Sequence, residues 1–216
     1  MSSTRVKICG LSTPETVNAS VSAGADYLGF NFYGRSPRCI TLETAATLAR
    51  LVPAHVLKVS LTVDADNATL DAIVAALKPD IIQVHGAETP ERLIELKARY
   101  GLTLMKAIPI SGPEDLEKSE IYRDSADLLL FDAKPPKSMQ NALPGGNGLA
   151  FDWSLLARQK PETPWMLSGG LDPENVAEAI RITGAEAVDV SSGVETAPGL
   201  KNPALIEKFI KAAKAV

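Results

Sequence analysis

The sequence predicts an α/β fold of the (β/α)8 class: a closed barrel of eight parallel strands, each followed by a helix, in a single domain over residues 1–216. Three observations carry this prediction. Eight short apolar or β-branched runs recur along the chain, eight helix-start signals alternate with them, and no composition shift marks a domain boundary. Strict alternation of strand and helix signals is typical of parallel strands joined by helices.

A strand is expected wherever a short apolar run lies between turn residues. The eight runs are Val6–Cys9, Tyr27–Phe30, Val56–Val63, Asp80–Val84, Thr103–Ile108, Asp127–Phe131, Trp165–Leu167 and Ala187–Val190. A helix is expected to begin at a capping residue, and several starts carry proline at the first helical position, where its missing N–H is harmless. The eight starts are Thr13–Glu15, Thr41–Glu43, Asp66–Asn67, Thr89–Glu91, Gly112–Glu114, Asp152–Trp153, Asp172–Glu174 and Asn202–Pro203.

A doubly wound open sheet is the main alternative, because five or six such units suffice for it and periodicity alone does not show closure. One long irregular segment, residues 134–150, is rich in proline and glycine. A loop of that length in a compact domain is usually functional or mobile. In a barrel, a site is expected at the C-terminal ends of the strands.

The composition argues against several classes of function. Lys plus Arg number 22 against 26 Asp plus Glu, a formal charge of -4, so we expect no basic surface that attracts nucleic acid or a membrane. The apolar runs are shorter than the roughly 20 residues that span a bilayer, and the first residues lack an apolar signal core, which favours a cytoplasmic protein. Two cysteines are too few for a disulfide framework, and two histidines exclude a three-histidine zinc site.

Cys9 and Asp132 end the first and sixth strands, with their side chains expected to face the barrel interior. A free thiol has a pKa of about 8.5, so a working base needs a positive group nearby, and Lys7 on the same face is one candidate. An acid at Asp132 needs a pKa about three units above its ordinary value, which corresponds to ~4 kcal/mol. Such a pair can act as acid and base. The alternatives are a buried apolar thiol and a carboxylate that caps a turn.

The loop after the second strand offers Arg35 and Arg38 beside Pro37, which stiffens the backbone. A guanidinium there can hold a carboxylate or a phosphate in two-pronged fashion. A solvated surface loop is the alternative.

Glycine-rich stretches follow the sixth, seventh and eighth strands, at residues 145–148, 168–170 and 191–193. Barrels commonly bind phosphate at the loops after strands seven and eight, through backbone N–H groups and the start of a short extra helix. We therefore expect Gly169, Gly170, Ser192 and Gly193 to bind a phosphate group, with plain turns as the alternative. A dinucleotide is not indicated, because no G-x-G-x-x-G follows the first strand.

Three further polar residues end strands: Asp64, His85 and Asp189. Each has a structural interpretation, as a turn cap, a hydrogen-bonded histidine and an orienting carboxylate, respectively. We expect His85, Asp189 and Lys7 to contribute with Arg38 to substrate binding. An acyl-transfer pair of Cys9 and His85 is conceivable, but the signatures of thiol hydrolases are absent.

Seven segments recur in this order in one known family, at the same strand ends. They are Val6–Gly10, Gly29–Phe32 leading to Ser36–Arg38, Gln83–Gly86, Leu130–Asp132, Gly148–Trp153, Leu167–Leu171 and Asp189–Glu195. Through them the chain resembles the phosphoribosylanthranilate isomerases of tryptophan biosynthesis, over essentially all of its length. The order of the segments together with their strand-end placement makes the resemblance specific.

The resemblance implies an Amadori rearrangement of an aminoaldose to an aminoketose. It implies that Asp132 protonates the furanose ring oxygen, that Cys9 removes the C2′ proton, and that Arg38 holds the anthranilate carboxylate. Gly170 and Ser192 resemble backbone contributors to the phosphate site. No cofactor and no metal is implied, because the nitrogen of the substrate supplies the electron sink.

Two other functions stay open at this stage. The histidine-pathway aminoaldose isomerase catalyses the same rearrangement. The resemblance to that family would imply two carboxylates as acid and base, whereas this chain has Cys9 in place of an aspartate on the first strand. A barrel that binds a phosphate ligand without turnover is the other alternative, and it does not need Cys9 and Asp132. The partner expected is a small-molecule phosphosugar, and the sequence is compatible with a monomer or a homodimer.

Overall fold

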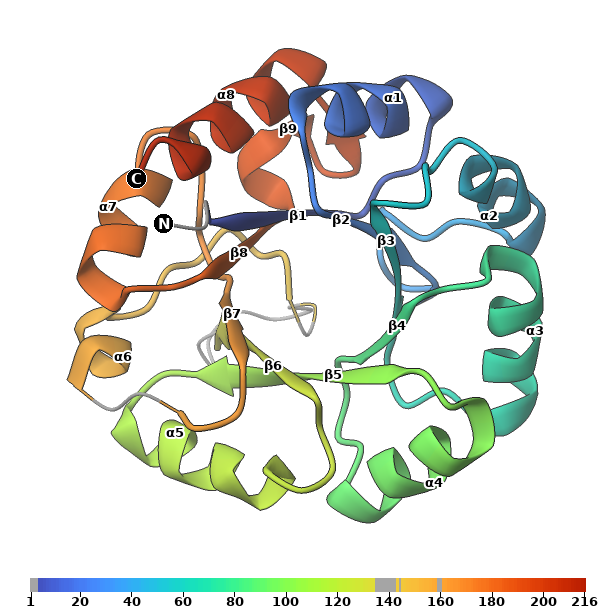
Figure 1. The fold of residues 1–216 in the computed structure, drawn as a ribbon, viewed down its shortest axis with the longest axis horizontal. Helices are drawn as coiled ribbons and strands as arrows, with labels where there is room; N and C mark the ends of the chain where they lie inside the picture. Colours follow the sequence, from blue (N-terminus) through green and yellow to red (C-terminus); the bar gives the residue numbers. More distant parts are fainter. Residues whose placement is uncertain (1–3, 135–142, 144, 159–160) are drawn as a thin grey trace.

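The computed structural model describes residues 4–134, 143, 145–158 and 161–216. Eight parallel strands pair in sequence order from β1 to β8 and close into a barrel, because β8 also pairs with β1 along Arg5–Ile8. The helices form a ring outside the strands (Figure 1). This arrangement confirms the predicted (β/α)8 barrel, the TIM-barrel fold, and the open doubly wound sheet is wrong.

The predicted elements are present, with boundaries shifted by a few residues. The barrel strands are β1 (Arg5–Cys9), β2 (Tyr27–Asn31), β3 (Leu57–Thr62), β4 (Ile81–Val84), β5 (Thr103–Ile110), β6 (Leu128–Ala133), β7 (Trp165–Leu167) and β8 (Ala187–Val190). The α-helices are α1 (Pro14–Ala23), α2 (Leu42–Ala49), α3 (Asn67–Leu77), α4 (Pro90–Tyr100), α5 (Pro113–Ser119), α6 (Ser154–Arg158), α7 (Val176–Thr183) and α8 (Pro203–Lys214). Two single-turn 3-10 helices, η1 (Glu120–Tyr122) and η2 (Ser192–Val194), complete the helical elements of the described residues.

Five helices begin at the side-chain caps that the sequence predicted. Thr13, Thr41, Asp66, Thr89 and Asn202 each accept a hydrogen bond from a backbone N–H of the first helical turn. Such a cap satisfies one of the donors that a helix start leaves without an intrahelical partner. These starts therefore agree with the prediction to within a residue.

Helix α7 begins at Val176, and the start predicted at Asp172–Glu174 is wrong. The Asp172 carboxylate accepts hydrogen bonds from the backbone N–H groups of Glu174 and Asn175, at 2.7 and 3.0 Å. An aspartate that bonds the backbone just after it stabilises a turn, and this competes with helix. The residues predicted to open the helix therefore form the turn before it.

Two other details of the chain path differ from the prediction. Helix α6 begins at Ser154 instead of Asp152–Trp153, because Asp152 accepts a hydrogen bond from the Ser154 N–H at 3.0 Å and occupies the preceding turn. A short antiparallel hairpin follows η2 and was not predicted. Its strands are β9 (Glu195–Ala197) and β10 (Leu200–Lys201), which lie outside the barrel sheet.

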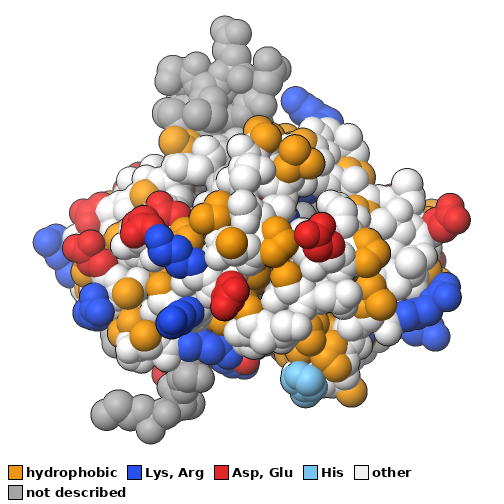
Figure 2. Space-filling view, turned by 90° about the horizontal axis from the view of Figure 1, so that it is seen from above, with side chains coloured by type: hydrophobic (Ala, Val, Ile, Leu, Met, Phe, Trp, Pro, Cys, Tyr) orange, Lys and Arg blue, Asp and Glu red, His pale blue; other side chains and the backbone are white. Residues whose placement is uncertain are grey.

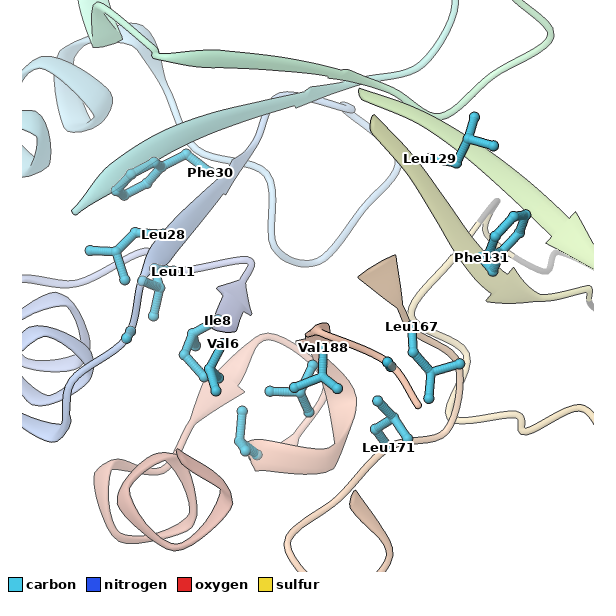
Figure 3. Packing of buried hydrophobic residues seen from close by; sticks show 14 of the residues in the cluster. Val6, Ile8, Leu11, Leu28, Phe30, Leu129, Phe131, Leu167, Leu171 and Val188 are labelled. Atoms are coloured by element: carbon cyan, nitrogen blue, oxygen red, sulfur yellow. The ribbon is translucent and has the colours of Figure 1, made fainter. Parts of the chain in front are cut away.

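Two apolar clusters form the core, one on each face of the barrel sheet. Outward residues, including Val6, Ile8, Leu28 and Phe30, fill the space between strands and helices (Figure 3). The inner cluster lies inside the barrel and comprises Tyr27, Val59, Ile81, Met105, Ala107, Leu128, Leu130, Met166 and Ala187. This alternation confirms that Lys7, Cys9 and Asp132 lie on inward positions of their strands.

Basic and acidic side chains are interspersed on the face seen in Figure 2, where neither sign forms a continuous field. Within the described part of the chain, no helix is long and apolar enough to cross a membrane.

Candidate active site

A pocket opens at the C-terminal ends of the barrel strands. Eight of the ten predicted site residues line it: Cys9, Arg38, His85, Asp132, Gly169, Gly170, Asp189 and Ser192. The strand ends thus bring together residues that lie far apart in the sequence, as a parallel barrel requires.

Lys7 and Gly193 do not line this pocket. Lys7 is fully buried and donates from Nζ to Asp189 Oδ1 at 2.8 Å, across the pairing of β1 with β8. The other carboxylate oxygen of Asp189 accepts from the Ser168 hydroxyl at 3.0 Å. Gly193 packs against the Leu171 carbonyl, where the loops after β7 and β8 meet. Both predicted residues therefore lie behind the pocket wall.

Cys9 is buried at the end of β1 and 5% exposed. Burial raises the pKa of its thiol above the ordinary value, and Asp189 adds to this, although the charges of Lys7 and Lys201 act in the opposite direction. The Lys7 ammonium stays charged, because its interactions with Asp189 and Cys9 outweigh burial and raise its pKa. In the free protein Cys9 is therefore a thiol beside a fixed positive charge.

Asp132 lies near the end of β6 with its side chain in the same pocket. Burial, followed by the negative charge of Asp189, raises its pKa from 3.8 to about 7. Its Oδ1 accepts a hydrogen bond from the Ala133 N–H at 2.9 Å, which favours the anion and limits the rise. A carboxyl with this pKa holds a proton that it can donate near neutral pH.

His85 lies beside this carboxyl, with Nε2 3.6 Å from Asp132 Oδ2. Burial, followed by the charges of Lys106 and Lys7, lowers the pKa of its imidazole to about 3, so the ring is neutral. No hydrogen bond joins His85 to Cys9 among the described residues, so the geometry does not support an acyl-transfer pair.

Arg38 is held differently from the prediction. Its Nε and Nη2 donate to the two carboxylate oxygens of Glu195, each at 2.8 Å, and Nη2 also donates to the Gly146 carbonyl at 3.2 Å. The two-pronged edge predicted for a ligand is thus occupied by Glu195, which also pairs with Lys201 on β10. The remaining group, Nη1, lies on the side of Gly146 and donates to no acceptor among the described residues.

The loops after β7 and β8 bring glycine and serine backbone to the pocket. Gly169, Gly170 and Ser192 line the pocket, and no described residue accepts a hydrogen bond from their backbone N–H groups. Gly170 has a φ of +65°, and a side chain there would place Cβ 2.7 Å from the Ala150 nitrogen. Backbone N–H groups directed at one region are a common way to bind phosphate.

The long segment after β6 contributes to the pocket through Leu143 and residues 145–148. Residues 135–142 and 144, also within the segment predicted to be functional, lie outside the described residues. Asp64 does not line the pocket, and its Oδ1 accepts from the Ala87 N–H at 2.7 Å, in agreement with its interpretation as a turn cap.

Sequence reasoning missed two residues that shape the site. Glu195 clamps Arg38, and it was noticed only as the end of a family segment. Gln83 lines the pocket on β4, two residues before His85 on the same inward face. A polar residue at an inward position near the end of an apolar strand is the sequence signal that could have identified it.

Comparison with known proteins agrees with this geometry. A family model described as N-(5'phosphoribosyl)anthranilate (PRA) isomerase matches residues 6–212. The N-(5'-phosphoribosyl)anthranilate isomerase of Parvibaculum lavamentivorans is 73% identical over 212 residues, which cover 98% of this chain and 99% of the relative. That of Paracoccus denitrificans is 56% identical over 210 residues, with 97% of each chain covered.

Solved structures show the same likeness. Phosphoribosyl anthranilate isomerase from Thermotoga maritima superposes with a TM-score of 0.87 at 36% identity, covering 99% of this chain and all of that one. A solved structure of phosphoribosyl anthranilate isomerase in complex with reduced 1-(o-carboxyphenylamino)-1-deoxyribulose 5-phosphate gives a TM-score of 0.83 at 34% identity, with 99% of this chain and 100% of that one covered. Fold, site geometry and sequence agree, and the chain belongs to the N-(5'-phosphoribosyl)anthranilate isomerase family.

Proposed function

We propose that Asp132 and Cys9 are the general acid and general base of the Amadori rearrangement that this isomerase catalyses in tryptophan biosynthesis. The reaction converts N-(5'-phosphoribosyl)anthranilate to 1-(2-carboxyphenylamino)-1-deoxyribulose 5-phosphate. The observation that carries the proposal is that the side chains of Asp132 and Cys9 line one pocket, where burial raises the pKa of Asp132 to about 7. A buried acid and a thiol that share one cavity supply both proton transfers.

In the first step the Asp132 carboxyl donates its proton to the furanose ring oxygen. The bond from C1′ to that oxygen breaks, and the lone pair of the anthranilate nitrogen forms a C1′–N double bond. In the second step the Cys9 thiolate takes the proton from C2′, and the electrons of that C–H bond move toward the iminium nitrogen. The resulting enolamine takes up a proton at C1′ and loses the 2′-hydroxyl proton to give the ketone. All electrons come from the substrate, so we propose that no cofactor takes part.

The raised pKa of Cys9 in the free protein is compatible with a base that forms during the reaction. Ring opening creates an iminium cation in the pocket, and a positive charge close to the thiol favours release of its proton to water at the pocket mouth, which leaves the thiolate. Lys7 already acts in this direction, because its charge opposes the effect of burial on Cys9. We propose that Lys7 and Asp189 contribute to substrate binding through the ammonium and carboxylate charges that they place at the pocket wall.

Arg38 and the glycine loops supply positive potential for a doubly anionic substrate. We propose that Arg38 binds the anthranilate carboxylate through Nη1, because Glu195 occupies the other edge of its guanidinium. Gly169, Gly170 and Ser192 bind the phosphate through backbone N–H groups, and Gly193 keeps the two phosphate loops in contact. Local donors of this kind are needed, because the formal charge of the whole chain is -4.

The wider setting of the enzyme follows from the same proposal. We propose that it works in the cytoplasm as a single barrel domain, as a monomer or a homodimer. Its partner is the small phosphosugar substrate, with no role for nucleic acid or a membrane.

The test is a turnover assay with freshly generated phosphoribosylanthranilate, whose fluorescence disappears on conversion. Asp132→Asn and Cys9→Ala should each lower kcat about 10²-fold or more, because each removes one proton transfer. Arg38→Ala should chiefly raise KM. Unchanged fluorescence at high concentrations of the wild-type protein would overturn the function. Near-full activity of Cys9→Ala would overturn the assignment of the base alone.

A further inference from the structure

Gln83 contacts His85 at the ring nitrogen farther from Asp132, and this contact bears on the tautomer of the imidazole. Gln83 Nε2 lies 3.3 Å from His85 Nδ1. An amide nitrogen only donates hydrogen bonds, so Nδ1 must accept, and a neutral imidazole that accepts at Nδ1 carries its proton on Nε2. Gln83 is 1% exposed and its Oε1 has no hydrogen-bond partner among the described residues, so within that part of the chain the contact with His85 is the one hydrogen bond of the amide.

The second ring nitrogen of His85, Nε2, faces the proposed acid. Nε2 lies 3.6 Å from Asp132 Oδ2, and both side chains are 8% exposed. That distance is slightly beyond a hydrogen bond, but catalytic contacts often tighten once the substrate is bound. The low pKa of His85 keeps the ring neutral, so it offers Asp132 an N–H without a full positive charge.

The buried ion pair of Lys106 and Glu88 holds the peptide segment that carries His85. Lys106 Nζ donates to the Gly86 carbonyl at 2.6 Å and to Glu88 at 3.0 Å. Glu88 in turn accepts from the Gly86 N–H at 2.8 Å. The residue after His85 is therefore held at both its N–H and its carbonyl, which limits movement of the ring relative to Asp132.

We propose that Gln83 is a positioning residue that holds neutral His85 with its proton on Nε2, so that this N–H stabilises the Asp132 carboxylate. A carboxyl that has given its proton to the substrate is left as a buried anion, and an N–H directed at it lowers the energy of that state. With the other tautomer, a lone pair would face the anion and repel it. The proposal rests on the proposed role of Asp132, but the tautomer of His85 does not depend on it.

The chain has two histidines, so ¹⁵N NMR of histidine-labelled protein shows two imidazoles, and exposed His55 serves as the internal reference. We expect the His85 signals of a neutral ring protonated at Nε2 from pH 5 to pH 8. Gln83→Met should lose this preference, and Gln83→Glu should move the proton to Nδ1, because a carboxylate accepts where the amide donates. A wild-type ring that is protonated at Nδ1, or charged, would overturn the proposal without any variant.

Kinetics separate this role from a merely structural one. Gln83→Met should lower kcat ~10-fold, the typical effect of one hydrogen bond to a charged group, and leave KM within about two-fold. His85→Gln can place an amide N–H near the Nε2 position, whereas His85→Asn places one near Nδ1, so the first should keep more of kcat. Equal losses of kcat in His85→Gln and His85→Asn, or a change in KM alone in Gln83→Met, would overturn the positioning role. Absence of turnover in the wild-type protein would instead overturn the proposed function and leave the tautomer result intact.

Discussion

Replacing Asp132 by asparagine should stabilise the folded protein at neutral pH while it removes the proposed acid. Burial and the charge of Asp189 raise the pKa of this carboxyl from 3.8 to about 7. Below pH 3.8 the group is protonated in both the folded and the unfolded chain. As the pH rises, the unfolded chain ionises first, so folding stability falls until the pH passes the folded pKa. A difference of about three units corresponds to ~4 kcal/mol, the amount by which the native carboxyl destabilises the fold at pH 8.

Urea unfolding of the wild-type protein and Asp132→Asn between pH 4 and pH 8 measures this difference. The variant should gain ~4 kcal/mol relative to the wild type across the range, on top of any constant offset from the substitution. Asp115→Asn is the matched control: burial opposes ionisation of Asp115, but hydrogen bonds from Ser111 and the charge of Lys134 outweigh it and lower its pKa. Its stability effect should therefore stay nearly constant over the same range. An Asp132→Asn difference that is equally constant would refute the argument.

Three further substitutions test other contacts of the site. Glu195→Gln removes the charge that holds the Arg38 guanidinium, so steady-state kinetics should show KM raised about ten-fold with kcat little changed; a fall in kcat alone would contradict this. Gly145→Ala would place Cβ 2.4 Å from Asp132 Oδ2, so kcat should drop while inorganic phosphate binds as before in calorimetry. Lys7→Met leaves its buried carboxylate partner unpaired and should cost about 3–5 kcal/mol of stability in urea unfolding, where a loss below about 1 kcal/mol would show that the pair is dispensable.

The barrel and most of the pocket were predictable from the sequence, because both depend on order along the chain. Alternating strands and helices specify parallel strands whose C-terminal ends meet at one face. Cys9 and Asp132 could therefore be placed in one pocket without any knowledge of their distance. The predicted inward direction of both side chains also follows from strand alternation, and the inner cluster with Leu128 and Leu130 agrees with it.

The remaining features depend on side-chain contacts that the strand and helix signals do not specify. Arg38 was predicted to hold a ligand with two prongs, but Glu195 reaches that edge through an extra hairpin outside the barrel sheet. The predicted start of α7 was wrong because the side chains of Asp172 and Asn175 each accept a hydrogen bond from the other's backbone N–H, which forms a turn before the helix begins. Lys7 was expected to contact the substrate, yet its inward direction leads to Asp189 on the neighbouring strand. For Arg38 and Lys7 the position of the partner is set only by the closed fold, whereas the start of α7 is decided by side-chain bonds to the local backbone.

The buried pair of Lys7 and Asp189 has opposite effects on the two proposed catalytic groups. The negative charge of Asp189 raises the pKa of Asp132 and so preserves an acid, while the positive charge of Lys7 lowers that of Cys9 and so favours a base. A single ion pair has these two effects only if Asp132 interacts more strongly with Asp189 and Cys9 interacts more strongly with Lys7. The register of β1 with β8 places Lys7 opposite Asp189 and two residues before Cys9, so closure of the barrel creates this asymmetry. The pairing of β8 with β1, which closes the barrel, therefore also contributes to the difference between the pKa effects on Asp132 and on Cys9.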